Sequence, residues 1–274
     1  MAIDTPYPEL SELLTLMGEA GQRMSEIDAT EAAAGNISVY VGWPLDPRRI
    51  FPNVETLTLP AAVPELAGRA FLVSGSGRRL REIIHDPPAN LGCVIVDEGG
   101  VTGRLYTSQR RLYARLTSEF NSHLSVHRDQ VAQTGTNFHA VIHAQPPHLT
   151  YLSHIPRYLD ELFLNRRLLR WQPETIINLP EGLGVIPFRL PGSPELMGAT
   201  VETLRTHRVV LWAKHGVMAR SDQSVKRASD RIEYAETGAR YEYMNLVNGE
   251  QAEGLSDDEM RTICRAFNVQ QSIF

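Results

Sequence analysis

Histidines are the residues best suited to do chemistry in this 274-residue sequence, which contains nine of them. His143 lies near the end of an apolar stretch, FHAVIHA at 138–144, and His215 near the end of another, VVLWAKHGV at 209–217. Strand ends beside tight turns are places where side chains converge, and two imidazoles with one carboxylate suit Zn²⁺ or a similar ion. These two residues are therefore candidate metal ligands, although a strand-end histidine can also simply bond a backbone carbonyl.

The other histidines carry a weaker signal. His123 and His127 are four residues apart on a predicted helix, a spacing that can hold a metal, but no glutamate follows His123 as in the HExxH pattern. We therefore interpret them as half-exposed side chains on an amphipathic helix. The same structural interpretation applies to His85, His148, His154 and His207.

An anion site and two carboxylates are further candidates. The stretch SGSG at 74–77 follows a predicted strand, and its glycines would let backbone N–H groups approach an anion while the serine hydroxyls add donors. Because the stretch is neither a Walker loop nor GxGxxG, an ordinary glycine turn is an equal alternative. Glu119 lies just inside a predicted helix and Glu174 just before a predicted strand. A first-turn glutamate commonly only complements the helix dipole.

The elements that must position these residues are strands and helices in mixed order. Apolar runs that end at turn residues predict strands at 36–41, 71–77, 93–100, 138–144, 175–180 and 209–217. Helical spacing and capping residues predict helices after Pro8, Ser118 and Ser193, and at 222–247 and 257–267. The proline-rich stretch 44–70 is predicted to be irregular. Because a regular parallel βαβ rhythm is absent, the pattern predicts an α/β or α+β fold in one domain spanning 1–274.

Composition and charge argue against several classes of protein. The apolar fraction of 42% and charged fraction of 22% are those of a globular protein. The net charge of −5 disfavours nucleic-acid binding, and no apolar run is long enough to cross a membrane. Two cysteines, Cys93 and Cys264, form neither a disulfide framework nor a metal spacing. With no secretory signal at its start, we expect a cytoplasmic protein without nucleic-acid or membrane partners.

Seven motifs, taken in order, resemble those of one known family. They are Gly35-Asn36 before a strand, FLVSGSG, DPPANLG, Thr117-Ser118-Glu119, VIHAQPPHLT, LPEGLGVIPFRLPGS and VVLWAKHGV. The chain resembles the class II, metal-dependent aldolases of the adducin-head superfamily, and among them most those that act on rhamnulose 1-phosphate. The resemblance implies one α/β domain in three layers, a central and mainly antiparallel sheet with helices on both sides, assembled as a homotetramer.

The resemblance also implies a role for each matching residue. His143 and His215 would bind Zn²⁺ or another divalent metal near a subunit interface. Glu119 would hold the metal at rest and act as acid or base, and Glu174 would be a second catalytic carboxylate. The residues implied to surround the substrate phosphate are Gly35, Asn36, Ser74, Gly75, Ser76, Gly77, Thr117 and Ser118.

Two positions depart from the family pattern. Gln145 stands where the second histidine of a His-x-His pair is expected, and its amide oxygen is a harder and weaker metal ligand than an imidazole nitrogen. Gln145 or His148 would then be the third ligand. Ala33 stands where the sugar-phosphate aldolases carry an asparagine that contacts phosphate.

The implied activity is cleavage of a phosphorylated deoxy-ketose, such as rhamnulose 1-phosphate, to dihydroxyacetone phosphate and lactaldehyde through a metal-stabilised enediolate. The scarcity of lysines agrees, because a Lewis acid makes a Schiff-base lysine unnecessary. The expected partner is a small sugar phosphate. Two alternatives remain: a decarboxylase or epimerase on the same scaffold, and a non-catalytic, adducin-like interaction module.

Overall fold

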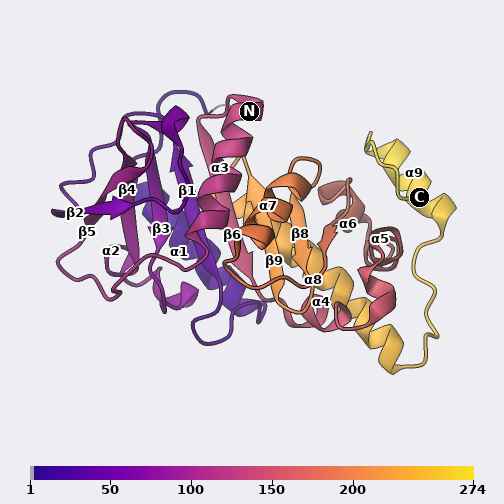
Figure 1. Cartoon of the computed structure of the whole chain (residues 1–274). Coiled ribbons are helices and arrows are strands. Elements are labelled where there is room, and N and C mark those ends of the chain that lie inside the picture. The colour runs from indigo at the N-terminus through magenta and orange to yellow at the C-terminus, as the bar shows by residue number, and fades with distance from the viewer. Residues whose placement is uncertain (1–2) are drawn as a thin grey trace.

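The computed structural model describes residues 3–274, which form a nine-stranded sheet with helices on both faces (Figure 1). The strands lie in the order β2-β5-β4-β3-β1-β6-β9-β8-β7. Neighbouring strands are antiparallel except for β7 and β8, which are parallel. The predicted mainly antiparallel, three-layered fold is therefore confirmed.

The strands are β1 (Asn36–Val41), β2 (Asn53–Thr58), β3 (Ala70–Ser74), β4 (Leu91–Val96), β5 (Thr102–Thr107), β6 (Phe138–Ala144), β7 (Gly184–Ile186), β8 (Val209–Trp212) and β9 (Gly216–Ser221). The α-helices are α1 (Leu10–Glu26), α2 (Pro87–Asn90), α3 (Phe120–Thr134), α4 (Pro147–Leu152), α5 (Glu161–Leu169), α6 (Pro173–Asn178), α7 (Pro194–Thr203), α8 (Val225–Val247) and α9 (Asp257–Ala266). Short 3-10 helices are η1 (Pro64–Leu66), η2 (Leu80–Glu82) and η3 (Pro156–Leu159). Over residues 3–274, no helix has the length and apolar character that crossing a membrane requires.

The side chains of β1 alternate between two cores, one on each face of the sheet. Ile37 and Val39 belong to the larger apolar cluster, which α1 and α8 complete. Tyr40 belongs to a second cluster, together with Phe120 and Leu124 of α3. Because successive residues of a strand point to opposite faces, every second residue of β1 is directed toward α3. Figure 1 shows α3 and α7 in front of the sheet, on the side turned to the viewer.

Two predicted strands are wrong in part or in whole. Residues 175–180 form no strand, because a proline in the first turn starts helix α6, which covers Pro173–Asn178. Residues 209–217 are a hairpin of β8 and β9 rather than one strand, with Lys214 in the left-handed conformation (φ 63°) in the turn. The strands predicted at 36–41 and 138–144 are confirmed with those bounds as β1 and β6.

The stretch predicted to be irregular, 44–70, contains one strand. Strand β2 lies at the edge of the sheet with almost all of its side chains exposed, so its sequence lacks the apolar alternation that marks a half-buried strand. Among residues 3–274 its only strand partner is β5, which the sequence pattern also did not reveal. The helices predicted after Pro8, Ser118 and Ser193 are confirmed as α1, α3 and α7.

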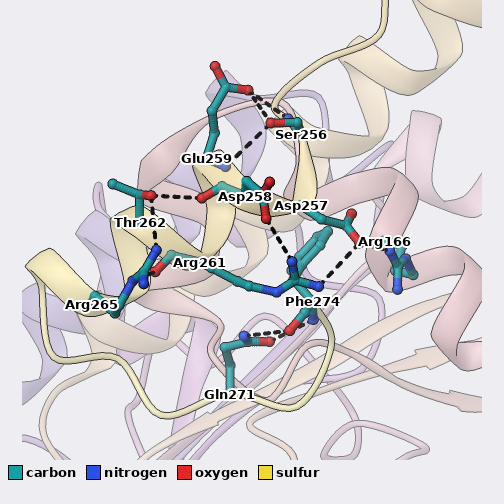
Figure 2. A network of polar contacts seen from close by, with 10 residues as sticks. All are labelled: Arg166, Ser256, Asp257, Asp258, Glu259, Arg261, Thr262, Arg265, Gln271 and Phe274. Atoms are coloured by element: carbon teal, nitrogen blue, oxygen red, sulfur yellow. Dashed lines mark hydrogen bonds and ion pairs between the residues drawn. The ribbon is translucent and has the colours of Figure 1, made fainter.

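The C-terminal helix α9 is held beside α5 and α6 by polar contacts at one end of the molecule (Figures 1 and 2). Ser256 and Glu259 form a reciprocal capping box at its start. Arg166 of α5 pairs with Asp257, and its guanidinium lies 5.5 Å from the ring centre of Phe274. These contacts join the last segment of the chain to α5, and the helix predicted at 257–267 is confirmed.

Two helical glycines should respond in opposite ways to alanine. A Cβ at Gly238 of α8 would lie 2.5 Å from the carbonyl oxygen of Leu168, whereas a Cβ at Gly198 of α7 would meet no atom within 4 Å. We expect Gly238→Ala to lower the free energy of unfolding by about 1–3 kcal/mol through overpacking. Gly198→Ala should raise it by roughly 0.5–1 kcal/mol, because alanine restricts the unfolded chain. Thermal unfolding midpoints measure both changes, and shifts in the same direction would contradict the packing of α8 on α5.

Candidate metal centre

Glu119, His143 and His215 come together in the described chain so that one ligand atom from each lies within 4.8 Å of the others. Nε2 of His143 lies 3.6 Å from Oε2 of Glu119, and Nε2 of His215 lies 3.6 Å from Oε1. The centres of the two imidazole rings are 4.8 Å apart. These separations exceed hydrogen-bond lengths, so the three groups surround a common point rather than bond one another.

Pairing between β6 and β9 brings the two histidines together. His143 is the second-last residue of β6, and His215 lies in the turn that leads into β9. The pairing of Ala144 with Val217 sets the register of the two strands there. A Cβ on Gly216 would lie 2.4 Å from the carbonyl oxygen of Ala144. Only glycine therefore lets the turn approach β6 closely enough to place His215 beside His143.

The protonation states suit a cation. Nδ1 of His143 is 2.8 Å from the carbonyl oxygen of Val217, which can only accept a proton, so Nε2 carries the lone pair toward Glu119. Burial, with a smaller effect from His143, lowers the pKa of His215 to about 4. Burial raises the pKa of Glu119, but His143 and the hydrogen bond from Asn36 outweigh it and hold the pKa below its ordinary value. One carboxylate with two imidazoles matches the donor set of catalytic His₂Glu zinc sites.

The segments predicted to surround a phosphate lie beside Glu119. Ile37, directly after Asn36, donates its N–H to Oγ of Ser74 at 3.0 Å. Thr117 donates its N–H to the carbonyl oxygen of Ser74, also at 3.0 Å. The structure thus brings the three predicted segments together: Gly35-Asn36, Ser74-Gly75-Ser76-Gly77 and Thr117-Ser118.

Two backbone N–H groups of the loop at 74–77 already donate hydrogen bonds within the protein. Gly75 donates to the carbonyl oxygen of Asn90 at 2.9 Å, and Ser76 donates to that of Arg115 at 2.8 Å. These two N–H groups cannot cradle an anion in this conformation. Within residues 3–274, the Ser76 hydroxyl and the Gly77 N–H have no hydrogen bond, and both remain candidate donors.

The interpretation of His123 and His127 as half-exposed side chains is wrong. Both are fully buried between α3 and β1, and Oγ of Ser38 lies 2.6 Å from Nδ1 of His123 and 2.7 Å from Nε2 of His127. A signal existed in the sequence: Glu119, His123 and His127 recur every four residues. That spacing defines one face of a helix.

Three further candidates lie outside the cluster. Glu174 is exposed in the first turn of α6, which packs on α5, α8 and α9. The side chain of Gln145 passes the turn that holds His215, since its Cγ lies 3.0 Å from where a Cβ of Gly216 would be. Nδ1 of His148 is 2.6 Å from Oε1 of Glu236 on α8, so this histidine is paired on the side of α8.

Comparisons with known proteins identify the family of the chain. The family model described as "Class II Aldolase and Adducin N-terminal domain" matches residues 15–243. Rhamnulose-1-phosphate aldolase from Bacteroides thetaiotaomicron is 30% identical over 264 residues, which cover 96% of each chain. The enzyme of the same name from Klebsiella pneumoniae subsp. pneumoniae is 31% identical over 214 residues, covering 78% of this chain and 76% of the relative.

A solved structure extends the similarity to the fold. The sugar-phosphate aldolase from Thermotoga maritima superposes with a TM-score of 0.74 at 26% identity, covering 89% of this chain and 98% of the other. Family model, relatives and solved structure thus cover nearly the whole described chain. On this basis the protein belongs to the class II aldolase and adducin family.

Proposed function

We propose that this protein is a metal-dependent aldolase, a lyase that cleaves a phosphorylated deoxy-ketose such as rhamnulose 1-phosphate to dihydroxyacetone phosphate and lactaldehyde. The observation that carries the proposal is the meeting of Glu119, His143 and His215 within 4.8 Å. Similarity to rhamnulose-1-phosphate aldolases along almost the whole chain supports this substrate class. We further propose that the enzyme acts as a cytoplasmic homotetramer.

The ligands of the metal are His143 and His215, with Glu119 in reach at rest. Two nitrogen donors favour a borderline ion such as Zn²⁺ over hard ions. When bound there, the ion would supply Lewis-acid stabilisation of negative charge on the carbonyl and hydroxyl oxygens of the ketose. The Nδ1–H bond from His143 to Val217 keeps the lone pair of Nε2 directed at this position.

Glu119 is the group that moves the proton. Its carboxylate is ionised and buried, with 5% of the residue exposed, so water competes little for the proton that it exchanges with substrate. His143 presents the lone pair of Nε2 on the side of Glu119, because its Nδ1–H is bonded to Val217, and therefore it does not donate a proton to the carboxylate. Glu119 is thereby kept available as the base that takes the hydroxyl proton when retro-aldol cleavage starts, and once protonated it can return that proton to the enediolate carbon.

The substrate phosphate would bind at the segments beside Glu119. Hydroxyl groups of Ser74, Ser76, Thr117 and Ser118, with the N–H of Gly77, can donate to its oxygens. Binding energy from the phosphate, remote from the bond that breaks, would orient the ketose at the metal. Gly35 and Asn36 complete this neighbourhood.

Glu174 is proposed as a second carboxylate through assembly. It is exposed on α6 and does not join the cluster of Glu119, His143 and His215 within the described chain. Its exposure supports a contribution to the site of a neighbouring subunit in the homotetramer.

The proposed reaction has a direct test. With rhamnulose 1-phosphate and Zn²⁺, we expect the protein to release dihydroxyacetone phosphate. A second enzyme that reduces this product gives the rate of its release. Glu119→Gln should lower kcat about 10²–10⁴-fold because the proton acceptor is lost. Ser76→Ala should instead raise KM with little change in kcat, because it removes a contact made equally in the ground and transition states.

Other products would decide between the alternatives. Release of CO₂ from a sugar acid or formation of an epimer, with no dihydroxyacetone phosphate, would identify a decarboxylase or epimerase. A zinc-loaded protein that turns over none of these substrates would contradict catalysis and support an adducin-like module.

The metal ligands can be tested by binding alone. We expect one Zn²⁺ or Co²⁺ per chain by elemental analysis, and His215→Ala should weaken binding at least about tenfold by calorimetry. His148→Ala is the matched control, because His148 pairs with Glu236 and should leave affinity unchanged. If His215→Ala and His148→Ala weaken zinc binding equally, the loss is not specific to His215 and does not identify it as a ligand, or His148 is the third ligand.

Gln145 provides a gain-of-function test. Its side chain passes the turn that carries His215, so an imidazole at this position should reach the ion as a third nitrogen donor. We expect Gln145→His to raise zinc affinity and, with it, the rate of aldol cleavage. Unchanged affinity in a folded variant would mean that position 145 does not face the metal.

A further inference from the structure

A buried chain of polar contacts leads away from Glu119 into the protein core. Nδ2 of Asn36 donates to Oε2 of Glu119 at 2.7 Å. Oδ1 of the same amide contacts Nε2 of His123. Nδ1 of His123 then lies 2.6 Å from Oγ of Ser38. The site carboxylate is therefore linked through an amide and an imidazole to a serine on the middle of β1.

The chain continues beyond the serine to two more histidines. Oγ of Ser38 lies 2.7 Å from Nε2 of His127, and Nδ1 of His127 lies 2.8 Å from Nδ1 of His139 on β6. Nε2 of His139 is buried and has no hydrogen-bond partner among residues 3–274. Ser38 and all three histidines are 0% exposed. Five contacts thus run in series without reaching solvent.

The spacing of the two elements makes this series possible. Glu119, His123 and His127 recur every four residues along α3, a rise of about 6 Å. Asn36 and Ser38 are two residues apart along β1, a rise of roughly 6.6–6.8 Å. Because the two rises nearly match, side chains of helix and strand alternate along the interface and each contacts the next.

All three histidines are neutral in this environment. Burial, with a smaller effect from His127, lowers the pKa of His123 to about 3. Burial likewise holds the pKa values of His127 and His139 well below their ordinary value. Each ring therefore has one nitrogen that donates a hydrogen bond and one that accepts. Once the donating nitrogen of one ring is fixed, the donating nitrogen of the next ring is fixed as well.

The carboxylate sets the direction of the whole series. The ionised carboxylate of Glu119 can only accept hydrogen bonds. Asn36 must therefore turn its NH₂ group toward Glu119 and its amide oxygen toward His123. His123 then donates from Nε2 and accepts at Nδ1 from the hydroxyl of Ser38. The hydroxyl oxygen accepts from Nε2–H of His127, whose Nδ1 accepts from Nδ1–H of His139.

The reverse direction is excluded by its two ends. It would turn the amide oxygen of Asn36 toward the carboxylate of Glu119, placing two acceptors against each other at 2.7 Å. It would also put a hydrogen on Nε2 of His139, leaving a buried donor without a partner. Buried orphan N–H groups are rarer than under-satisfied acceptors, because each forfeits a full hydrogen bond.

We propose that Asn36, Ser38, His123, His127 and His139 form a one-directional hydrogen-bond chain that positions Glu119 by fixing Oε2 as an acceptor and leaving Oε1 for proton exchange. The catalytic part of this inference rests on the proposed function of Glu119. The chain acts through the carboxylate, so its members are positioning residues. Aligned hydrogen bonds polarise one another, which strengthens the last bond, from Asn36 to Glu119.

The tautomers of the histidines provide a test that does not depend on activity. In the full-length, zinc-loaded protein with ¹⁵N-labelled histidine, long-range ¹H–¹⁵N spectra at pH 7 distinguish the protonated nitrogen of each ring. We expect neutral rings protonated at Nε2 for His123 and His127 and at Nδ1 for His139. A charged ring, or the opposite tautomer at any of the three, would overturn the chain.

Steady-state kinetics test the positioning role. Ser38→Ala interrupts the chain at its middle and should lower kcat about 10–100-fold, with KM and zinc content nearly unchanged. Ser122→Ala is the matched control, because Ser122 is also 0% exposed and its hydroxyl has no partner in the described chain. It should leave kcat unchanged. Equal losses in the two variants would assign the effect to packing and overturn the proposal.

Paired substitutions of His127 separate positioning from stability. His127→Leu fills the space with an apolar group and should keep or raise the unfolding midpoint while lowering kcat. His127→Gln keeps an N–H near the position of Nε2 and should restore most of the activity. Equal activity of these two variants would overturn the role of His127. If His127→Leu does not fold, the tautomer spectra of the wild type provide the test instead. A wild type that is inactive on rhamnulose 1-phosphate but shows the expected tautomers would contradict the proposed function and leave the chain intact.

Discussion

The structure around the site depends on keeping an ionised carboxylate out of water. Burying a charge costs several kcal/mol unless hydrogen bonds or opposite charge compensate it. Glu119 is 5% exposed, and it is compensated by the amide of Asn36 and by its place at the start of α3, where the helix dipole is positive. A divalent cation between Glu119 and the two imidazoles would complete the compensation. The stability and the chemistry of the site therefore rest on the same contacts.

The order of the strands brings the groups around Glu119 together from distant parts of the sequence. Strands β1, β6 and β9 are neighbours at the centre of the sheet, although more than 100 residues separate β1 from β9. Asn36 is paired with His143 across the β1–β6 ladder, and His143 with Met218 across the β6–β9 ladder. A one-residue slip in either ladder would turn these side chains to the opposite face. Strand register thus fixes which groups face Glu119.

How much the sequence could predict follows from where each signal lies. The apolar runs of β1 and β6 are local patterns, and both strands were predicted with their observed bounds. The residues TIINLP have strand-like composition, but the proline before them and packing on α5 and α8 favour a helix. His215 was predicted at a strand end, and it lies instead in the turn of a hairpin, next to the only residue type that allows the close approach to β6.

The burial of His123 and His127 is hard to predict because their partners lie elsewhere in the chain. A polar stripe on a helix ordinarily faces water, and contacts with Asn36, Ser38 and His139 on two strands make this stripe part of the core. The residue types on β1 gave a hint, since two polar residues in a strand of six stand on the same face.

The polar chain also accounts for how the core is divided. On the face covered by α1 and α8, apolar side chains form one continuous cluster, whereas the α3 face holds two separate clusters. One of these includes Tyr40 and Leu124, the other Val126 and Val141. Ser38, His123 and His127 belong to the same elements as these apolar residues, so the chain forms a polar boundary within the face. Apolar side chains there would join the two clusters and bury no polar groups, at no cost in desolvation. A protein that retains three neutral histidines in this position gives up some stability, and what it gains is a single, fixed orientation of Glu119.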